Sequence, residues 1–127
     1  MTKKKLDLEM FWNLPRCKGD FIKDGSYCAL GSMLKAMGES DSEIRKQFSH
    51  PFLYELKLAK VDYDNVWRIN DSGYVVEEEF KQLFPEGNPE AAKRLIIQLL
   101  MEKDLVEFTE DPLTFKIPAE VKENVKV

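Results

Sequence analysis

Apolar side chains recur every three or four residues between positions 27 and 37, a spacing that places them on one face of a helix. We expect this helix to begin near Tyr27, where either Asp24 or Ser26 is suited to cap the first turn. Gly38 would end it in the left-handed conformation. The buried stripe would consist of Tyr27, Leu30, Leu34 and Met37.

A longer helix is predicted after Asn88, which favours the N-cap position, and Pro89, which favours the first helical position. Its inner face would carry Ala92, Leu95, Ile96, Leu99 and Leu100. Beyond it, residues 105–109 and 113–117 are predicted strands, joined in a hairpin by Glu110-Asp111-Pro112. The inner face of the hairpin would hold Phe108, Phe115 and Ile117. This helix and hairpin resemble the end of a winged-helix domain.

Shorter amphipathic segments fill the middle of the chain. Ser40 and Glu43 form a capping box that opens a helix ending at Ser49, before a proline. Pro51 suits the first position of the next helix, and the turn-forming residues 70–73 end a third. A fourth would run up to Pro85. The apolar residues of these segments are Ile44, Phe48, Phe52, Leu53, Leu56, Tyr63, Val66, Trp67, Val76, Phe80, Leu83 and Phe84.

The beginning of the chain is ambiguous. Residues 6–14 fit a helix and a strand, because apolar residues stand both four and two positions apart. Pro15 would end either element. Residues 16–24, which carry glycine and aspartate, are predicted to form a loop.

These elements predict the α+β class with mainly helical content: a compact bundle of five or six short helices with a C-terminal β-hairpin. A chain of 127 residues can bury one core without disulfides or metals, so we expect a single domain over residues 1–127, with 1–5 and 119–127 flexible. The predicted core includes Leu30, Leu34, Leu56, Trp67, Phe80, Leu95, Leu99 and Phe115.

Charge and hydropathy narrow the range of partners. The formal net charge of −4 disfavours a general attraction to nucleic-acid phosphates. No apolar run reaches the roughly 18 residues of a membrane span. No signal-peptide-like apolar stretch follows Lys3-Lys4-Lys5. We therefore expect a cytoplasmic protein without a membrane or nucleic-acid partner, in which Cys17 and Cys28 are thiols.

No metal or cofactor is expected. Two cysteines and one histidine, without Cys-x-x-Cys spacing, fall short of the four ligands of a structural zinc site. The glycines are too scattered to form a phosphate-binding loop.

Cys28 is the candidate nucleophile. In the first turn of a helix, unpaired N–H groups and the helix dipole can lower the pKa of a thiol towards the reactive range. A cysteine nucleophile also needs a base and a group that orients it, and the candidates are His50, the single histidine, with Asn70 or Asp71. These residues would make a cysteine-dependent hydrolase or transferase.

A structural interpretation of the same residues is favoured. Isolated cysteines are usually buried and inert, and the small residues Ala29, Gly31, Ser32 and Ala36 around Cys28 would let another element approach closely. Asn and Asp favour turns and helix caps, which is the expected role of Asn70 and Asp71. The candidate partner-binding group is instead Glu77-Glu78-Glu79, on the outer side of a predicted helix.

Two segments, Cys28-Ala29-Leu30-Gly31-Ser32-Met33 and Ile69-Asn70-Asp71-Ser72-Gly73, carry a family resemblance. They are similar to a family of small, uncharacterised phage and bacterial proteins in which a helix beginning Cys-x-x-Gly-Ala-Leu precedes an Asn-Asp dipeptide and an amphipathic helix. Members often carry Ala where this chain has Ser32, and the match covers roughly residues 11–84. The resemblance implies a phage or mobile-element setting, and that Cys28 lies beside the Asn70-Asp71 turn.

The expected function is therefore noncatalytic. We expect a small acidic phage or mobile-element accessory protein that binds and modulates a host protein with a basic surface, such as a component of a defence system. A Cys28-dependent hydrolase or transferase is the first alternative, and a winged-helix DNA-binding regulator is the second.

Overall fold

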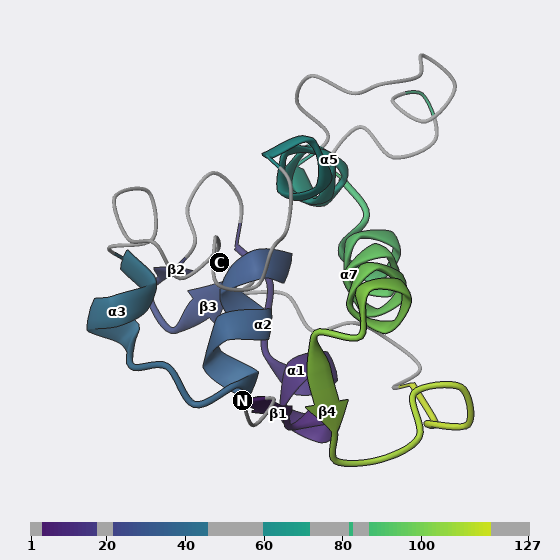
Figure 1. The fold of residues 1–127 in the computed structure, drawn as a ribbon. Helices are drawn as coiled ribbons and strands as arrows, with labels where there is room; N and C mark the ends of the chain where they lie inside the picture. The colour runs from purple at the N-terminus through teal and green to yellow at the C-terminus, as the bar shows by residue number, and fades with distance from the viewer. Residues whose placement is uncertain (1–3, 18–21, 46–59, 72–81, 83–86, 118–127) are drawn as a thin grey trace.

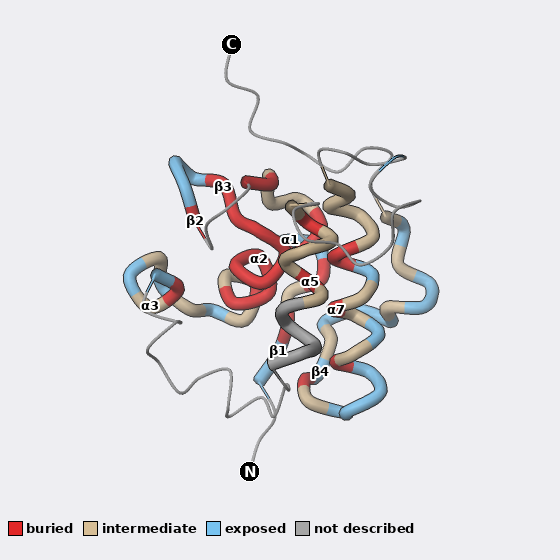
Figure 2. The backbone as a smooth tube through the Cα atoms, turned by 90° about the horizontal axis from the view of Figure 1, so that it is seen from above, coloured by how far each residue is buried: buried red, intermediate tan, exposed pale blue. Residues whose placement is uncertain are grey.

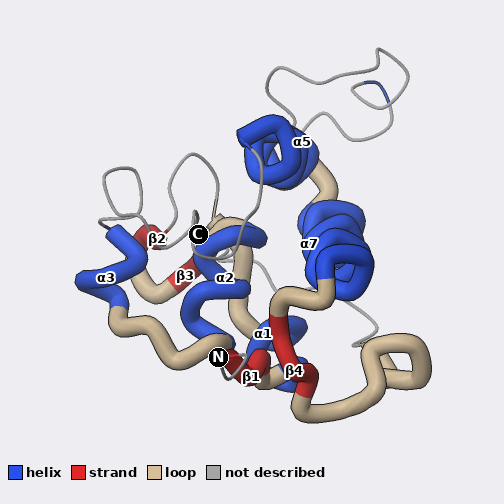
Figure 3. The backbone as a smooth tube through the Cα atoms, in the orientation of Figure 1, coloured by secondary structure: helices blue, strands red, loops and turns tan. Residues whose placement is uncertain are grey.

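The computed structural model describes residues 4–17, 22–45, 60–71, 82 and 87–117 (Figure 1). Five helices with defined bounds and four short strands lie in these ranges, so the predicted mainly helical α+β class is confirmed (Figure 3). The helix predicted near 51–56 and the tail at 119–127 lie outside the described residues, and so does all but residue 82 of the helix predicted near 76–84. Leu56 and Phe80 of the predicted core also lie outside the described residues, as does Phe48 of the helix predicted to end at Ser49.

Helix α2 (Ala29–Ala36) lies at the centre of the described fold (Figure 2). Seven of its eight residues are buried and only Lys35 is partly exposed, so the helix is covered well beyond the predicted stripe. Helix α3 (Asp41–Arg45) and helix α7 (Pro89–Lys103) contact it from opposite sides. Small residues such as Gly31 and Ser32 allow neighbours to pack closely on a helix buried around most of its circumference.

The ends of α2 show one correct and one incorrect prediction. Cys28, rather than Asp24 or Ser26, is the N-cap residue, and its Sγ accepts a hydrogen bond from the Gly31 N–H at 3.4 Å. At the other end Gly38 has φ +93°, as predicted. The Gly38 N–H donates to the Lys35 carbonyl and the Glu39 N–H to the Leu34 carbonyl, the two bonds of a Schellman motif.

Asp24 and Ser26 are unavailable as caps because they belong to a hairpin. Strand β2 (Ile22–Lys23) pairs antiparallel with β3 (Ser26–Tyr27), so the predicted loop is wrong here. Asp24 and Gly25 connect the strands with φ values of +49° and +78°. Positive φ at both central residues is typical of a type I′ turn, which Asp-Gly favours.

The ambiguous segment, residues 6–14, is mainly helical, and only its first residue belongs to a strand. Strand β1 (Lys4–Leu6) is followed by helix α1 (Leu8–Asn13). The change occurs at Asp7, whose Oδ1 accepts a hydrogen bond from the Met10 N–H at 3.0 Å and so caps α1. Lys4 and Lys5, which we expected to be flexible, are therefore part of a strand.

The C-terminal half contains one confirmed helix and one incorrect hairpin. Asn88 caps α7 as predicted, accepting a hydrogen bond from the Ala91 N–H at 2.9 Å. Strand β4 (Val106–Phe108) follows, but it pairs in parallel with β1 and not with residues 113–117. Those residues form no strand, because Asp111 accepts hydrogen bonds from the Leu113 and Phe115 N–H groups and coils the chain into a turn.

Helix α5 (Lys60–Asp71) packs beside α7 and also contacts α2 (Figure 1). In the predicted core, Leu30 and Leu34 are fully buried, as expected. Four other expected core residues are only partly buried at its edge: Trp67, Leu95, Leu99 and Phe115. The largest completely buried apolar side chains outside α2 include Leu6, Leu8, Phe11 and Ile44.

Candidate functional site

Cys28, the candidate nucleophile, is buried at the N-terminus of α2. Its Sγ is engaged by the Gly31 N–H, an interaction that favours the thiolate. Burial has the larger effect and raises the pKa of the Cys28 thiol to about 12. The thiol is therefore protonated at neutral pH, and in this conformation it is a poor nucleophile.

Asn70, at the end of α5, is completely buried beside it. Its side-chain oxygen accepts a hydrogen bond from the Ala29 N–H at 3.3 Å. Its amide group donates to the Cys17 carbonyl at 3.0 Å and to Asp71 Oδ1 at 2.7 Å. Asn70 thus caps a helix, as expected of this residue type, but the helix is α2 rather than its own. Cys28 therefore lies near Asn70 and Asp71 as expected, but these two residues are the end of α5 and not a turn.

Two residues that sequence reasoning missed complete this junction around Asn70. Arg16 is buried, and its Nη1 donates a hydrogen bond to the Asn70 carbonyl at 2.7 Å, so its guanidinium caps the C-terminus of α5. Gly87, with φ +87°, packs against the same carbonyl, where a Cβ would collide with the oxygen. Neither residue belongs to a periodic pattern, which is why the sequence did not point to them.

Lys93 is a second buried polar residue that sequence reasoning missed. Lysine is almost never fully buried, yet only 1% of Lys93 is exposed. Its Nζ donates to the Phe11 carbonyl at 2.6 Å and to the Leu14 carbonyl at 3.1 Å, at the C-terminal end of α1. The ammonium also lies 5.3 Å from the centre of the Phe11 ring and 6.0 Å from that of Trp12. Burial lowers its pKa to about 8.

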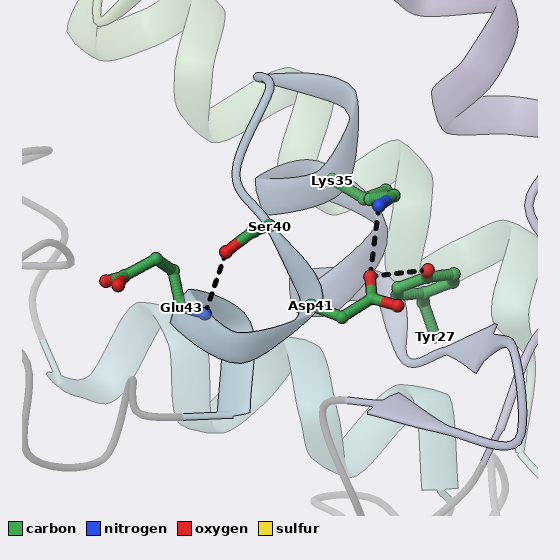
Figure 4. A network of polar contacts seen from close by, with 5 residues as sticks. All are labelled: Tyr27, Lys35, Ser40, Asp41 and Glu43. Carbon is green, nitrogen blue, oxygen red and sulfur yellow. Dashed lines mark hydrogen bonds and ion pairs between the residues drawn. The ribbon is translucent and has the colours of Figure 1, made fainter.

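A third polar group, near the surface, joins α2, β3 and α3 (Figure 4). Asp41 Oδ1 accepts hydrogen bonds from the Tyr27 hydroxyl at 2.9 Å and from Lys35 Nζ at 3.0 Å. Lys35 holds the pKa of Asp41 below its ordinary value, and the same contact raises the pKa of Lys35. Ser40 accepts a hydrogen bond from the Glu43 N–H, so the predicted helix cap at this position is confirmed. This group fixes α3 against α2.

The other predicted site residues lie outside the described residues. They are the candidate base His50 and the candidate partner-binding group Glu77, Glu78 and Glu79. The structure therefore brings together Cys28, Asn70 and Asp71, the members of the candidate catalytic set that it describes. Cys17 and Cys28 are not joined in a disulfide, in agreement with the prediction that both are thiols.

Within the described ranges, no group of three or more His, Cys, Asp or Glu side chains is placed to hold a metal ion. No described helix has the length and apolar character needed to cross a membrane. In comparison with known proteins, the chain matches no family model, no curated protein and no solved structure.

Proposed function

We propose that the protein acts by binding another protein and not by catalysis at Cys28. In this proposal it is a small acidic accessory protein of a phage or mobile element, acting in the cytoplasm on a host protein such as a component of a defence system. The observation that carries the proposal is the structural use of the candidate catalytic residues. Cys28 caps α2 as a buried, protonated thiol, and the side chain of Asn70 is occupied by the backbone of two other segments.

The winged-helix alternative receives less support. A wing requires a hairpin after the long helix, and in the described residues β4 pairs with β1 instead. Lys93, one of the basic residues that a phosphate-binding surface would have used, is buried against α1. The negative net charge disfavours DNA for the same electrostatic reason.

An acidic surface at the junction of α1 and the segment after β4 supports a basic partner. It consists of Asp7, Glu9, Glu110 and Asp111, of which the last three are exposed. The two segments are adjacent, because the Leu8 N–H donates a hydrogen bond to Thr109 Oγ1 at 3.1 Å. A basic surface on the partner would be attracted to these carboxylates, and the attraction would fall as salt is raised.

The same two segments expose large apolar side chains. Met10 of α1 is 40% exposed and Leu113 is 79% exposed. Met10 also lines a shallow surface hollow of about 430 Å³ together with Asp7, Glu9 and Asn13. Apolar side chains bordered by charge are the composition expected of a protein-binding surface, where apolar contact supplies affinity and charge accelerates association.

The test is a capture experiment followed by measured association rates. The immobilised protein is incubated with host lysate, the captured protein is identified and purified, and its association rate is measured at low and raised salt. Glu9→Lys combined with Glu110→Lys should slow association several-fold. Glu43→Lys combined with Glu90→Lys changes the net charge equally at other positions and serves as the matched control.

Two further variants separate the alternatives. A triple variant, Glu77→Lys, Glu78→Lys and Glu79→Lys, tests the surface predicted from sequence in the same assay. Cys28→Ser keeps a capping side chain and should bind the partner as the wild type does. Equal association rates for all the charge variants would contradict the proposed electrostatic contact, and tight, salt-sensitive binding to duplex DNA would favour the winged-helix alternative.

A further inference from the structure

The two cysteines are brought together by a second pairing of strand β3. The Tyr27 N–H donates to the Pro15 carbonyl at 2.8 Å, and the Cys17 N–H donates to the Tyr27 carbonyl at 3.3 Å. Tyr27 thus bonds through its N–H to the residue before Arg16 and through its carbonyl to the residue after it. This pattern pairs Tyr27 with Arg16 in the parallel direction. In this register the next residue of each strand, Cys17 and Cys28, also face each other.

The register places the two cysteine side chains on the same face. Side chains alternate between the two faces along extended chain, so Cys17 and Cys28 both point to the face opposite Arg16 and Tyr27. Cys28 is itself extended, with φ −67° and ψ 174°, so the strand geometry continues to this position. Neighbouring strands lie about 4.8 Å apart, within the Cα separation of about 4.4–6.8 Å that disulfides span.

Two further features agree with this proximity. Asn70 holds both segments, donating to the Cys17 carbonyl and accepting from the Ala29 N–H, so that one side chain fixes the register. Cys17 is also among the groups that raise the pKa of the Cys28 thiol. Both cysteines are buried, with 7% and 4% exposure, and no disulfide joins them.

We propose that Cys17 and Cys28 are a redox-responsive thiol pair that peroxide converts to an intramolecular disulfide. One thiol attacks the peroxide oxygen–oxygen bond and becomes a sulfenic acid, with release of one water. The second thiol then displaces the sulfenic hydroxyl as a second water, which forms the sulfur–sulfur bond. Two thiols are oxidised and one hydrogen peroxide is reduced to two waters.

Burial of the two thiols limits the rate of the first oxidation step. A protonated thiol reacts slowly with peroxide, so the first step requires an opening of the segment at 15–17 that exposes one sulfur and lets it ionise. Once the first sulfur is oxidised, the register supplies the second thiol as the resolving group. The disulfide would tie residue 17, next to Arg16, to the N-terminus of α2.

The experiment uses the full chain treated with hydrogen peroxide under native conditions. We expect a monomer whose intact mass is lower by two hydrogens, loss of both titratable thiols, and a peptide map that links Cys17 to Cys28. The oxidised protein should also unfold at a higher urea concentration than the reduced protein, because the crosslink restricts the unfolded chain. Reduction with dithiothreitol should restore the original mass and stability.

Single variants provide the controls. Cys17→Ser and Cys28→Ala each remove one partner, and each should instead gain oxygen atoms at the remaining thiol or form intermolecular dimers. Their circular dichroism and urea unfolding report whether they fold. Sulfinic acids or intermolecular dimers in the wild type without an internal link would overturn the proposal, as would two thiols that survive prolonged exposure to both peroxide and diamide.

Discussion

At the residue scale, two buried polar side chains decide how the helices meet. Asn70 joins the end of α5 to the start of α2 and to the Cys17 carbonyl. Lys93 joins α7 to the C-terminal carbonyls of α1. Each satisfies backbone groups that a helix end leaves without partners, so each acts as a cap supplied by a different helix. Their removal should therefore affect the contacts between helices more than the helices themselves.

Replacing Asn70 with Ala should lower the free energy of unfolding by about 3 kcal/mol, because the Ala29 N–H and the Cys17 carbonyl would be buried without partners. Urea denaturation measures the loss. Asn65→Ala is the matched control, since Asn65 lies on the same helix and is partly exposed. Equal, small losses for both variants would mean that the buried hydrogen bonds of Asn70 contribute little.

Lys93 should give the protein an unusual stability profile at alkaline pH. Burial lowers its pKa from 10.5 to about 8, so between these values the unfolded chain binds more protons than the folded chain. The protonation of Lys93 therefore makes the free energy of unfolding rise with pH over that window, by about 3 kcal/mol in total. Below pH 8 the lysine is charged in both states, and its contribution no longer changes.

The measurement compares the wild type with Lys93→Met across this window. The free energy of unfolding of the wild type should increase relative to that of Lys93→Met as the pH rises from about 8 to 10.5. Subtracting the free energy of unfolding of Lys93→Met from that of the wild type cancels the effects of other titrating groups. One of these is Cys28, whose raised pKa makes the folded state less stable as the pH rises. Lys116→Met, at an exposed position, should follow the wild type. A constant difference between wild type and Lys93→Met would contradict the pKa assignment.

At the scale of elements, helix ends with strong local signals were predictable. The Asn88 and Ser40 caps both occur as predicted, because each hydrogen bond involves residues only three positions apart. Of the predicted capping box, the structure shows the bond from the Glu43 N–H to Ser40. The β2–β3 hairpin also had a local signal, the Asp24-Gly25 dipeptide, which the prediction of a loop overlooked.

Elements defined by distant partners were not predictable. Strand β4 was identified correctly, but its partner β1 lies about a hundred residues earlier, and no local pattern encodes that choice. The candidate site likewise contains features that were predictable and features that were not. The proximity of Cys28 to Asn70 was expected, whereas Arg16 and Gly87 serve a carbonyl that becomes buried only when α5 packs in place.

The end of α2 provides a prediction at this scale. Gly38→Ala should reduce stability by about 1 kcal/mol, because an alanine at φ +93° is strained although nothing lies within 4 Å of its Cβ. Gly38→Asn should cost less, because asparagine tolerates the left-handed conformation. Thermal unfolding of both variants tests this order. An alanine variant as stable as the wild type would show that the Schellman hydrogen bonds do not require a glycine at position 38.

At the scale of the whole molecule, the parallel pairing of β1 with β4 joins the two ends of the described chain. Leu6 pairs with Phe108, and the Thr109 N–H donates to the Leu6 carbonyl. The Asp7 N–H in turn donates to the Ala36 carbonyl at the end of α2. The first described residues thus connect the central helix to the C-terminal strand. Weakening their contacts should therefore destabilise the described fold as a whole.

Replacing Leu6 with Ala tests this connection. Leu6 is completely buried, so its truncation should lower the free energy of unfolding by about 3 kcal/mol. Leu113→Ala removes the same atoms from a side chain that is 79% exposed, and it should change stability by less than about 0.5 kcal/mol. If β1 belongs to the cooperative unit, urea unfolding of Leu6→Ala followed by tryptophan fluorescence and by circular dichroism should give one coincident transition. Two separate transitions, or equal losses for the two leucines, would mean that the pairing of β1 with β4 is peripheral to the core around α2.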